Sequence, residues 1–286
     1  MLKRLLLLLV SLVWGNLFFL FSQLAATADP LPSQIVQYKQ VGEVSLTLHV
    51  FTPDEHKTSD CRPAIVFFFG GGWNGGTTSQ FYPQSAHLAK RGMVAICADY
   101  RVRSRHKTPP SVCVEDGKSA MRYVRAHASE LGIDPNRIAA GGGSAGGHVA
   151  TATATVDRFD AETDDFKVSC RPDALVLFNP VYDNGPEGYG HDRVKSYWED
   201  FSPLHNLDKD VPPTFVVLGT KDKLIPVSTA KAFKQRMNEL GVRSELHLFQ
   251  GQAHGFFNKL KYEETLRAAD AFLVSLGYLK AAAESE

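Results

Sequence analysis

The sequence predicts an α/β fold, in which a single domain is built on one mostly parallel, doubly wound sheet. Short apolar runs such as 63–69, 93–98 and 214–218 have almost no polar interruption, which is typical of strands buried on both faces. Stretches of helical length alternate with these runs along the chain, as in repeated strand–helix–strand units. Both observations favour a parallel sheet that helices cover on its two faces.

The individual elements follow in chain order. Strands are expected near 35–40, 44–51, 63–69, 93–98, 138–140, 174–178, 214–218 and 245–249. Helices are expected near 81–91, 112–131, 149–156, 228–240 and 262–276. A glycine directly follows the helices at 81–91, 112–131 and 228–240, where it supplies a natural stop. Residues 181–212 are rich in glycine, proline, tyrosine and tryptophan, and they predict a short lid insertion and no separate cap domain.

The first 28 residues are expected to be a signal peptide. A lysine and an arginine precede an apolar core at 5–21, and residues 26–28 fit a small-residue cleavage site after Ala28. An uncleaved anchor is the alternative, because the core is long, although a glycine and an asparagine interrupt it. The predicted domain then spans 29–286, and the protein is expected to be periplasmic or extracellular.

Charge and cysteine content narrow the possible partners and environment. The signal contains two basic residues and no acidic one, so its removal changes the formal charge from zero to −2, which gives no basic surface for nucleic acid. Cys61 and Cys170 each precede a predicted strand at the same sheet edge, so they could form a disulfide. Cys97 and Cys113 are expected to be buried thiols, and four free cysteines are the alternative.

The segment 141–147, Gly-Gly-Gly-Ser-Ala-Gly-Gly, is the most informative part of the chain. It contains Gly-x-Ser-x-Gly between a strand and a helix of small residues, which is the context of a nucleophile elbow. The turn is so tight that only glycine fits on both sides, and it holds Ser144 in a strained conformation with its hydroxyl above the sheet. A phosphate-binding turn is the alternative, but the segment lacks the Gly-x-x-x-x-Gly-Lys-Ser/Thr pattern.

Two later strand ends supply partners for this serine. Asp222 follows the strand at 214–218, and His254 follows the strand at 245–249, so both are expected at the edge of the sheet where Ser144 lies. A hydroxyl is a poor nucleophile until a base takes its proton, and a neutral imidazole can do so near pH 7. A carboxylate then fixes the imidazole tautomer and stabilises the imidazolium.

Other residues compete for these roles. Asp183 also follows a strand and is the alternative to Asp222. Among the other histidines, His148 is expected to pack in the core on the helix after Ser144, and His247 lies within a strand.

A second glycine-rich segment could bind the negative charge that develops on an attacked carbonyl. Residues 67–73, Phe-Phe-Phe-Gly-Gly-Gly-Trp, run from a strand into three glycines. Backbone amides there, together with the amide of Ala145, would form an oxyanion hole, and each such donor contributes about 3 kcal/mol to transition-state stabilisation.

These segments together resemble the α/β-hydrolase esterases of the acetyl esterase/lipase group, and in particular exported bacterial acetyl xylan and feruloyl esterases. The matching pieces are 69–73, 99–101, 132–135, 142–147, Asp222 and 254–256, which spread over most of residues 60–260. The resemblance implies a single-domain α/β-hydrolase with Ser144 as nucleophile, Asp222 as orienting acid and His254 as base.

The same resemblance implies that the amides of Gly71, Gly72 and Ala145 form the oxyanion hole. One departure is Phe69, because many relatives carry at this position a histidine that shapes the loop. The loop geometry is therefore the part of the site that the resemblance leaves open.

Aromatic and basic residues near these motifs have two interpretations each. Substrate stacking on a sugar or aryl acid and packing of the lid are both open for Trp73, Tyr182, Tyr189 and Trp198. The basic run at 101–106 is expected to be a solvated loop with structural salt bridges.

The sequence thus predicts a secreted serine esterase that hydrolyses short acyl esters, acetyl or feruloyl, on extracellular polysaccharide. No metal or organic cofactor is implied, and no nucleic acid or membrane partner is expected unless the N-terminal segment is retained. The alternatives are a lipid or small-molecule carboxylesterase and a non-catalytic binding protein of the same fold.

Overall fold

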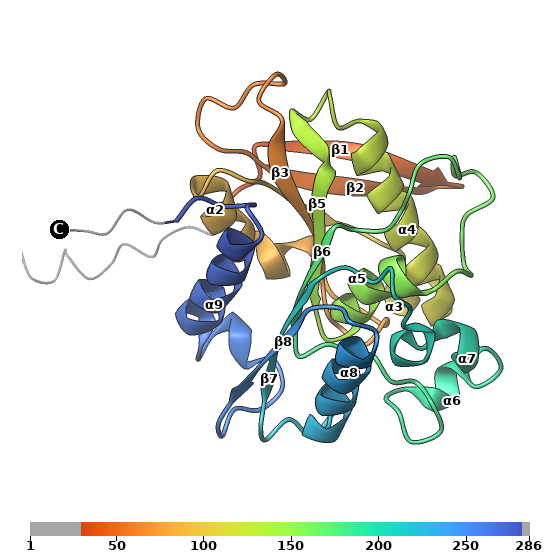
Figure 1. Cartoon of the computed structure of the whole chain (residues 1–286). Helices are drawn as coiled ribbons and strands as arrows, with labels where there is room; N and C mark the ends of the chain where they lie inside the picture. Colours follow the sequence, from red (N-terminus) through yellow and green to blue (C-terminus); the bar gives the residue numbers. More distant parts are fainter. Residues whose placement is uncertain (1–29, 282–286) are drawn as a thin grey trace, which may run out of the picture. The chain divides into compact units, whose positions relative to one another are not determined.

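The computed structural model describes residues 30–281, and its centre is an eight-stranded sheet (Figure 1). The strands are β1 (Gln34–Val41), β2 (Val44–Phe51), β3 (Arg62–Phe68), β4 (Val94–Ala98), β5 (Ile133–Gly143), β6 (Ala174–Phe178), β7 (Thr214–Gly219) and β8 (Ser244–Phe249). Their order in the sheet is β1-β2-β4-β3-β5-β6-β7-β8. Only β2 pairs antiparallel, with β1 and β4, and the pairs from β4 to β8 are parallel. The predicted fold class is confirmed.

Helices cover both faces of this sheet, as the doubly wound prediction requires. They are α2 (Tyr82–Lys90), α3 (Arg103–His106), α4 (Pro110–Ala126), α5 (Ala145–Thr155), α6 (His191–Val194), α7 (Trp198–Phe201), α8 (Val227–Glu239) and α9 (Tyr262–Ser275). Short 3-10 helices span Thr78–Phe81, Pro203–Asn206 and Phe256–Asn258. Helices α2 and α9 lie on one face, and α4, α5 and α8 lie on the other (Figure 1).

The two faces of the central strands build two separate apolar clusters. Along β3, Val66 and Phe68 pack in the cluster under α4, α5 and α8, whereas Ile65 and Phe67 pack in the cluster under α2 and α9. Successive side chains of a strand point to opposite faces, so a strand buried on both faces must be apolar throughout. This is why the apolar runs located β3, β4, β6 and β7 to within one residue at each end, whereas β5 extends well beyond the predicted range 138–140 at both ends.

Several helical segments differ from the prediction. Helix α5 begins at Ala145, before the predicted start at 149, and α6 and α7 lie in a segment for which no helix was predicted. Helix α4 ends at Ala126, whereas the prediction extended it to residue 131, and turns lead from there to Gly132 at φ 64°. The short helix α3 was not predicted. It buries none of its residues, so it has no apolar face to produce a periodic signal, and Lys107 at φ 60° ends it.

The four cysteines are all unpaired, so the suggested bond between Cys61 and Cys170 does not form. Cys61 precedes β3 and Cys170 precedes β6, but β5 lies between these two strands. Strands two places apart are separated by about 9–10 Å, whereas a disulfide requires Cα atoms within about 7 Å. The prediction placed the cysteines at the correct edge and lacked the strand order.

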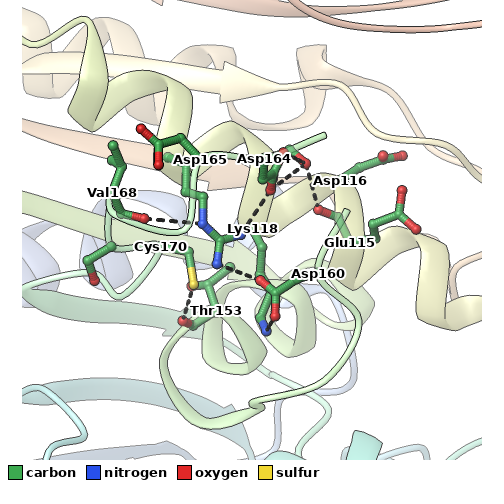
Figure 2. A network of polar contacts seen from close by, with 12 residues as sticks. Glu115, Asp116, Lys118, Thr153, Asp160, Asp164, Asp165, Val168 and Cys170 are labelled. Carbon is green, nitrogen blue, oxygen red and sulfur yellow. Dashed lines mark hydrogen bonds and ion pairs between the residues drawn. The ribbon is translucent and has the colours of Figure 1, made fainter. Parts of the chain in front are cut away.

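Ion pairs connect the segment 156–173, which lies between α5 and β6, to helix α4. Arg122 donates to the carboxylates of Asp160 and Asp164, and Lys118 pairs with Asp160 at 2.9 Å. Figure 2 shows these acidic side chains gathered beside α4, with the Cys170 thiol directed at the Thr153 carbonyl. These contacts attach an irregular segment to the helix.

The segment 181–212 contains α6, α7 and the 3-10 helix Pro203–Asn206, and it buries Val194 and Phe201 in the core. Within residues 30–281, no helix combines the length and the apolar character needed to cross a membrane. The predicted signal peptide at 1–28 lies outside the described residues.

Candidate active site

Ser144 sits at the sharp turn between β5 and α5. Its backbone has φ 54° and ψ −121°, a conformation that non-glycine residues rarely adopt. Glycines make the turn possible, because a Cβ on Gly146 would collide with the carbonyl oxygen of Phe68, and one on Gly142 would meet Gly146 at 2.5 Å. The predicted elbow therefore has a steric cause that the structure makes explicit.

Ser144, His254 and Asp222 form a hydrogen-bonded chain. The Ser144 Oγ lies 2.9 Å from Nε2 of His254, and Nδ1 of His254 lies 2.7 Å from Oδ2 of Asp222. The other Asp222 oxygen, Oδ1, accepts the amides of Leu224 and Ile225 at 2.8 and 3.0 Å. The carboxylate is an acceptor only, so it selects the imidazole tautomer with a proton on Nδ1 and leaves Nε2 free to accept from the hydroxyl.

The competing residues lie elsewhere. Asp183 accepts the Gly185 amide and lies 4.0 Å from His205, with no contact to His254. His148 is buried and its Nε2 lies 3.1 Å from the carbonyl oxygen of Phe201. Burial lowers the pKa of His148 to about 3, so it is a neutral core residue.

Asn179 is a site residue that the sequence reasoning missed. It directly follows β6, is fully buried and has φ 37°. Its Oδ1 accepts the Gly255 amide at 3.1 Å, and its Nδ2 lies 3.4 Å from Nε2 of His254. The signal was present, because an asparagine after a buried strand reaches the same sheet edge as Ser144 and Asp222.

The loop after β3 presents free amides beside Ser144. Gly71 has φ 134° and Gly72 has φ 62°, and a Cβ on Gly71 would collide with the carbonyl of Gly75. Within the described part of the chain, neither amide donates a hydrogen bond, whereas the Gly70 amide donates to Oε1 of Gln80 at 2.5 Å. The Ala145 amide opens α5, where the first N–H groups have no helical partner.

A cavity of about 400 Å³ opens above these groups. Backbone of Gly70, Gly71 and Gly72 and the side chains of Ser144 and His254 form one part of its wall. The remainder is formed by Asn74, Gln80, Gly143, Asn179, Tyr189, Arg193, Leu224, Gly255, Phe257 and Asn258. Within residues 30–281, no three histidine, cysteine or acidic side chains are grouped as metal ligands.

Comparison with known proteins supports one family. The BD-FAE family model matches residues 48–183, and the dienelactone hydrolase family model matches 189–285. Esterase 2 of Thermogutta terrifontis, in its apo form, is 44% identical, with a TM-score of 0.84 over 87% of this chain and 96% of that chain. The chain belongs to the α/β-hydrolase esterases.

Curated relatives in this family of serine hydrolases are larger. Esterase LipC of Mycobacterium tuberculosis is 31% identical over 68% of this chain and 53% of its own length. The probable carboxylic ester hydrolase LipM of the same organism is 29% identical over 84% of this chain and 60% of its own length. The chain therefore spans about half the length of the curated relatives that it matches.

Phe69 stands where many α/β-hydrolase esterases carry a histidine that shapes the glycine-rich loop. The structure explains how this loop after β3 is held without that histidine. The Phe69 ring stacks on Tyr100 with centroids 4.1 Å apart, and the Tyr100 hydroxyl donates to the Phe69 carbonyl at 2.5 Å. Both side chains are fully buried. An aromatic pair thus fixes the strand end from which the glycines continue.

The aromatic residues suggested for substrate contact divide into two groups. Tyr189 lines the cavity at Ser144, as one interpretation had it. Trp73, Tyr182 and Trp198 do not line it, so substrate contact by these three rings stays a prediction. Tyr182 is buried and stacks at 4.3 Å on Phe233, Trp198 packs on His205, and Trp73 is 1% exposed. All three rings pack in the core or against it, as the alternative interpretation had it, and Trp73 also lines a neighbouring cavity.

Proposed function

We propose that this protein is a serine esterase that hydrolyses carboxylic esters through an acyl-enzyme. The observation that carries the proposal is the chain of hydrogen bonds from Ser144 through His254 to Asp222 at the floor of an open cavity. Solved forms of Thermogutta terrifontis esterase 2 that are phosphorylated by paraoxon or phosphonylated by sarin agree with a reactive nucleophile in a close relative.

The residues define each step. Ser144 Oγ attacks the ester carbonyl while Nε2 of His254 takes the hydroxyl proton, and the imidazolium is stabilised by Asp222. The carbonyl oxygen becomes negative and accepts hydrogen bonds from the amides of Gly71, Gly72 and Ala145. The imidazolium then donates its proton to the leaving alcohol. Water, activated by the same base, attacks the acyl-enzyme and releases the acid and the free serine.

The acyl group is short in this proposal, and the alcohol belongs to an extracellular polysaccharide. A cavity of about 400 Å³ suits an acetyl or aryl acyl group better than a long chain. Structures of the Thermogutta esterase with propionate and with butyrate bound support short acids in that relative. The polysaccharide rests on the expected export signal and on the resemblance to acetyl xylan and feruloyl esterases.

Activity against a soluble aryl acetate and against acetylated xylan tests the proposal. Ser144→Ala removes the nucleophile, and we expect at least about a 10³-fold loss of kcat on both substrates. Asp222→Asn keeps the shape but favours the wrong tautomer, and we expect about a 10⁴-fold loss. Asp183→Asn is the matched control and should retain activity.

Full turnover by folded Ser144→Ala would disprove the mechanism. Activity on the aryl acetate without acetate release from xylan would keep the mechanism and reject the polysaccharide. A series of acyl chain lengths would then decide for or against a lipid carboxylesterase.

A further inference from the structure

A second cavity adjoins the one above Ser144. It has a volume of about 680 Å³ and shares Asn74 and Arg193 with the first cavity. Its other lining residues are Trp73, Arg103, Lys107, Thr108, Pro109, Pro110 and Asp192. They come from α3 and the turn after it, from the start of α4, from the glycine-rich loop after β3 and from α6. A substrate that reaches Ser144 can therefore extend past Asn74 and Arg193 into this space.

The charges of the second cavity are unbalanced. Arg103, Lys107 and Arg193 are exposed basic residues, and Asp192 is the single acidic residue among those that line it. None of these three basic side chains forms an ion pair within the described part of the chain. Net positive charge in a concave site concentrates anions there.

The absence of ion pairs is unusual in this protein. Every described arginine has a carboxylate partner except Arg103, Arg193 and Arg267. Two of these three exceptions line the same cavity. The basic run at 101–106 was expected to be a solvated loop with structural salt bridges. Arg101 and Arg105 form such salt bridges and Arg103 does not, but Arg101 is buried and residues 103–106 form α3 instead of a loop.

Arg193 is held in place without neutralisation. Its guanidinium carbon lies 4.9 Å from the centre of the Trp73 ring and 5.3 Å from that of Tyr189, and Nη1 donates to the Gly72 carbonyl at 2.6 Å. Its other N–H groups have no acceptor in the described residues. A guanidinium that is oriented by aromatic rings and keeps free N–H groups is suited to bind a carboxylate.

We propose that this second cavity is a subsite for the carboxylate of an acidic saccharide, so that the alcohol half of the ester belongs to a uronic-acid-bearing glycan. The inference rests on the proposed esterase function and names the substrate class of that site. The ester carbonyl sits at Ser144, and the neighbouring sugar units place a uronate among Arg103, Lys107 and Arg193. The acidic glycan is favoured over a neutral one because Asp192 is the single acidic residue that lines the cavity, which leaves its three basic side chains with a net positive charge.

The test is calorimetric titration of the full mature protein with matched oligosaccharides at low salt. The acidic probes are a glucuronic-acid-substituted xylo-oligosaccharide and an oligogalacturonide, and the neutral probe is an unsubstituted xylo-oligosaccharide of the same length. We expect at least one acidic probe to bind about fivefold or more tighter than the neutral probe, and added salt to reduce the difference.

Three variants assign the effect to the cavity. The double variant Arg103→Gln/Lys107→Gln should lose the preference for the acidic probe, whereas Arg267→Gln, the arginine outside the cavity, should keep it. Asp192→Asn should strengthen acidic binding by about two- to fivefold, because it removes the one opposing charge. Arg193 is left unchanged in this test because it also donates to the Gly72 carbonyl in the loop after β3.

Each outcome decides the inference separately from the mechanism. Equal binding of acidic and neutral probes, no binding of either, or an equal effect of Arg267→Gln would overturn the subsite. Hydrolysis of aryl acetate by the same samples reports on the esterase. Loss of preference with full aryl acetate turnover supports the subsite, whereas failure of the wild-type protein to hydrolyse any ester rejects the proposed function instead.

Discussion

At the scale of single residues, the site depends on strained or buried groups that the surrounding structure holds in place. Ser144 keeps its unfavourable backbone because Gly142 and Gly146 allow the close approach of Phe68. Asp222 is oriented by two backbone amides before it meets the imidazole of His254. The geometry at Nε2 is therefore set by groups that do not react.

A buried histidine gives the protein a predictable response to acid. The folded pKa of His148 is about 3, whereas that of an unfolded histidine is 6.5. Between these values the unfolded chain binds a proton that the folded chain does not, so folding stability falls as the pH is lowered from 6.5 towards 3. We expect His148 to contribute a slope of up to about 1.4 kcal/mol per pH unit over this range.

The variant His148→Gln tests this slope, because glutamine can still donate to the Phe201 carbonyl. Urea unfolding at several pH values should show a shallower acid decline for the variant than for the wild type. His247→Gln, at an exposed position of β8, is the control. Identical slopes for wild type and His148→Gln would contradict the assignment.

At the scale of elements, the joint between β1, the end of β4 and α4 is built on one buried carboxylate. Asp116 of α4 has a fully buried side chain and accepts Lys39 Nζ at 2.8 Å and Arg101 Nε at 2.8 Å. It also accepts the backbone amide of Arg101 at 3.0 Å. Three segments distant in sequence therefore meet at Asp116, which shares the neutralisation of the two cations with its neighbour Glu115.

Replacement of this acid should be costly. We expect Asp116→Ala to lower the free energy of unfolding by about 3–5 kcal/mol, because it leaves two basic groups with Glu115 alone. Chemical denaturation measures the loss. Glu239→Ala breaks the exposed pair with Arg236 and should cost no more than about 1 kcal/mol. Similar losses for the two variants would refute a structural role for burial.

Elements were predictable from the sequence where packing imposes a pattern. The strands β6 and β7 and the helix α9 were located to within one residue, because each is apolar on the faces that it buries. Helix α3 buries no residue and left no such pattern. The end of α4 was placed too late because Gly132 marks the end of a turn beyond the helix and not the end of the helix itself.

For the candidate site, the sequence predicted the three hydrogen-bonded side chains but not the residues that the lid brings to the cavity. Motif and strand-end position suffice to bring Ser144, Asp222 and His254 to one edge of the sheet, because the carboxyl ends of parallel strands meet there. Strand order, which excludes the Cys61–Cys170 bond, does not follow from any local pattern. The same is true of lid packing, which keeps Tyr182 and Trp198 away from the cavity and brings in Arg193.

At the scale of the whole molecule, the expected export signal determines where the protein acts. Production of the full-length chain in a bacterial host, followed by intact mass spectrometry, tests it. We expect the mass of a protein that begins at Asp29, because the small residues before it fit signal peptidase. A mass that includes residues 1–28 would favour the retained anchor and leave the proposed chemistry unchanged.

The contact between Arg193 and the Gly72 carbonyl links the turnover of the proposed esterase to its substrate selectivity. Its guanidinium donates to the loop whose amides form the proposed oxyanion hole, and the same side chain lines both the cavity at Ser144 and the proposed subsite. A change at this position would alter turnover and selectivity together. Directed evolution of this scaffold toward new esters would therefore find position 193 resistant to change, and would reach new specificities sooner through Arg103 and Lys107.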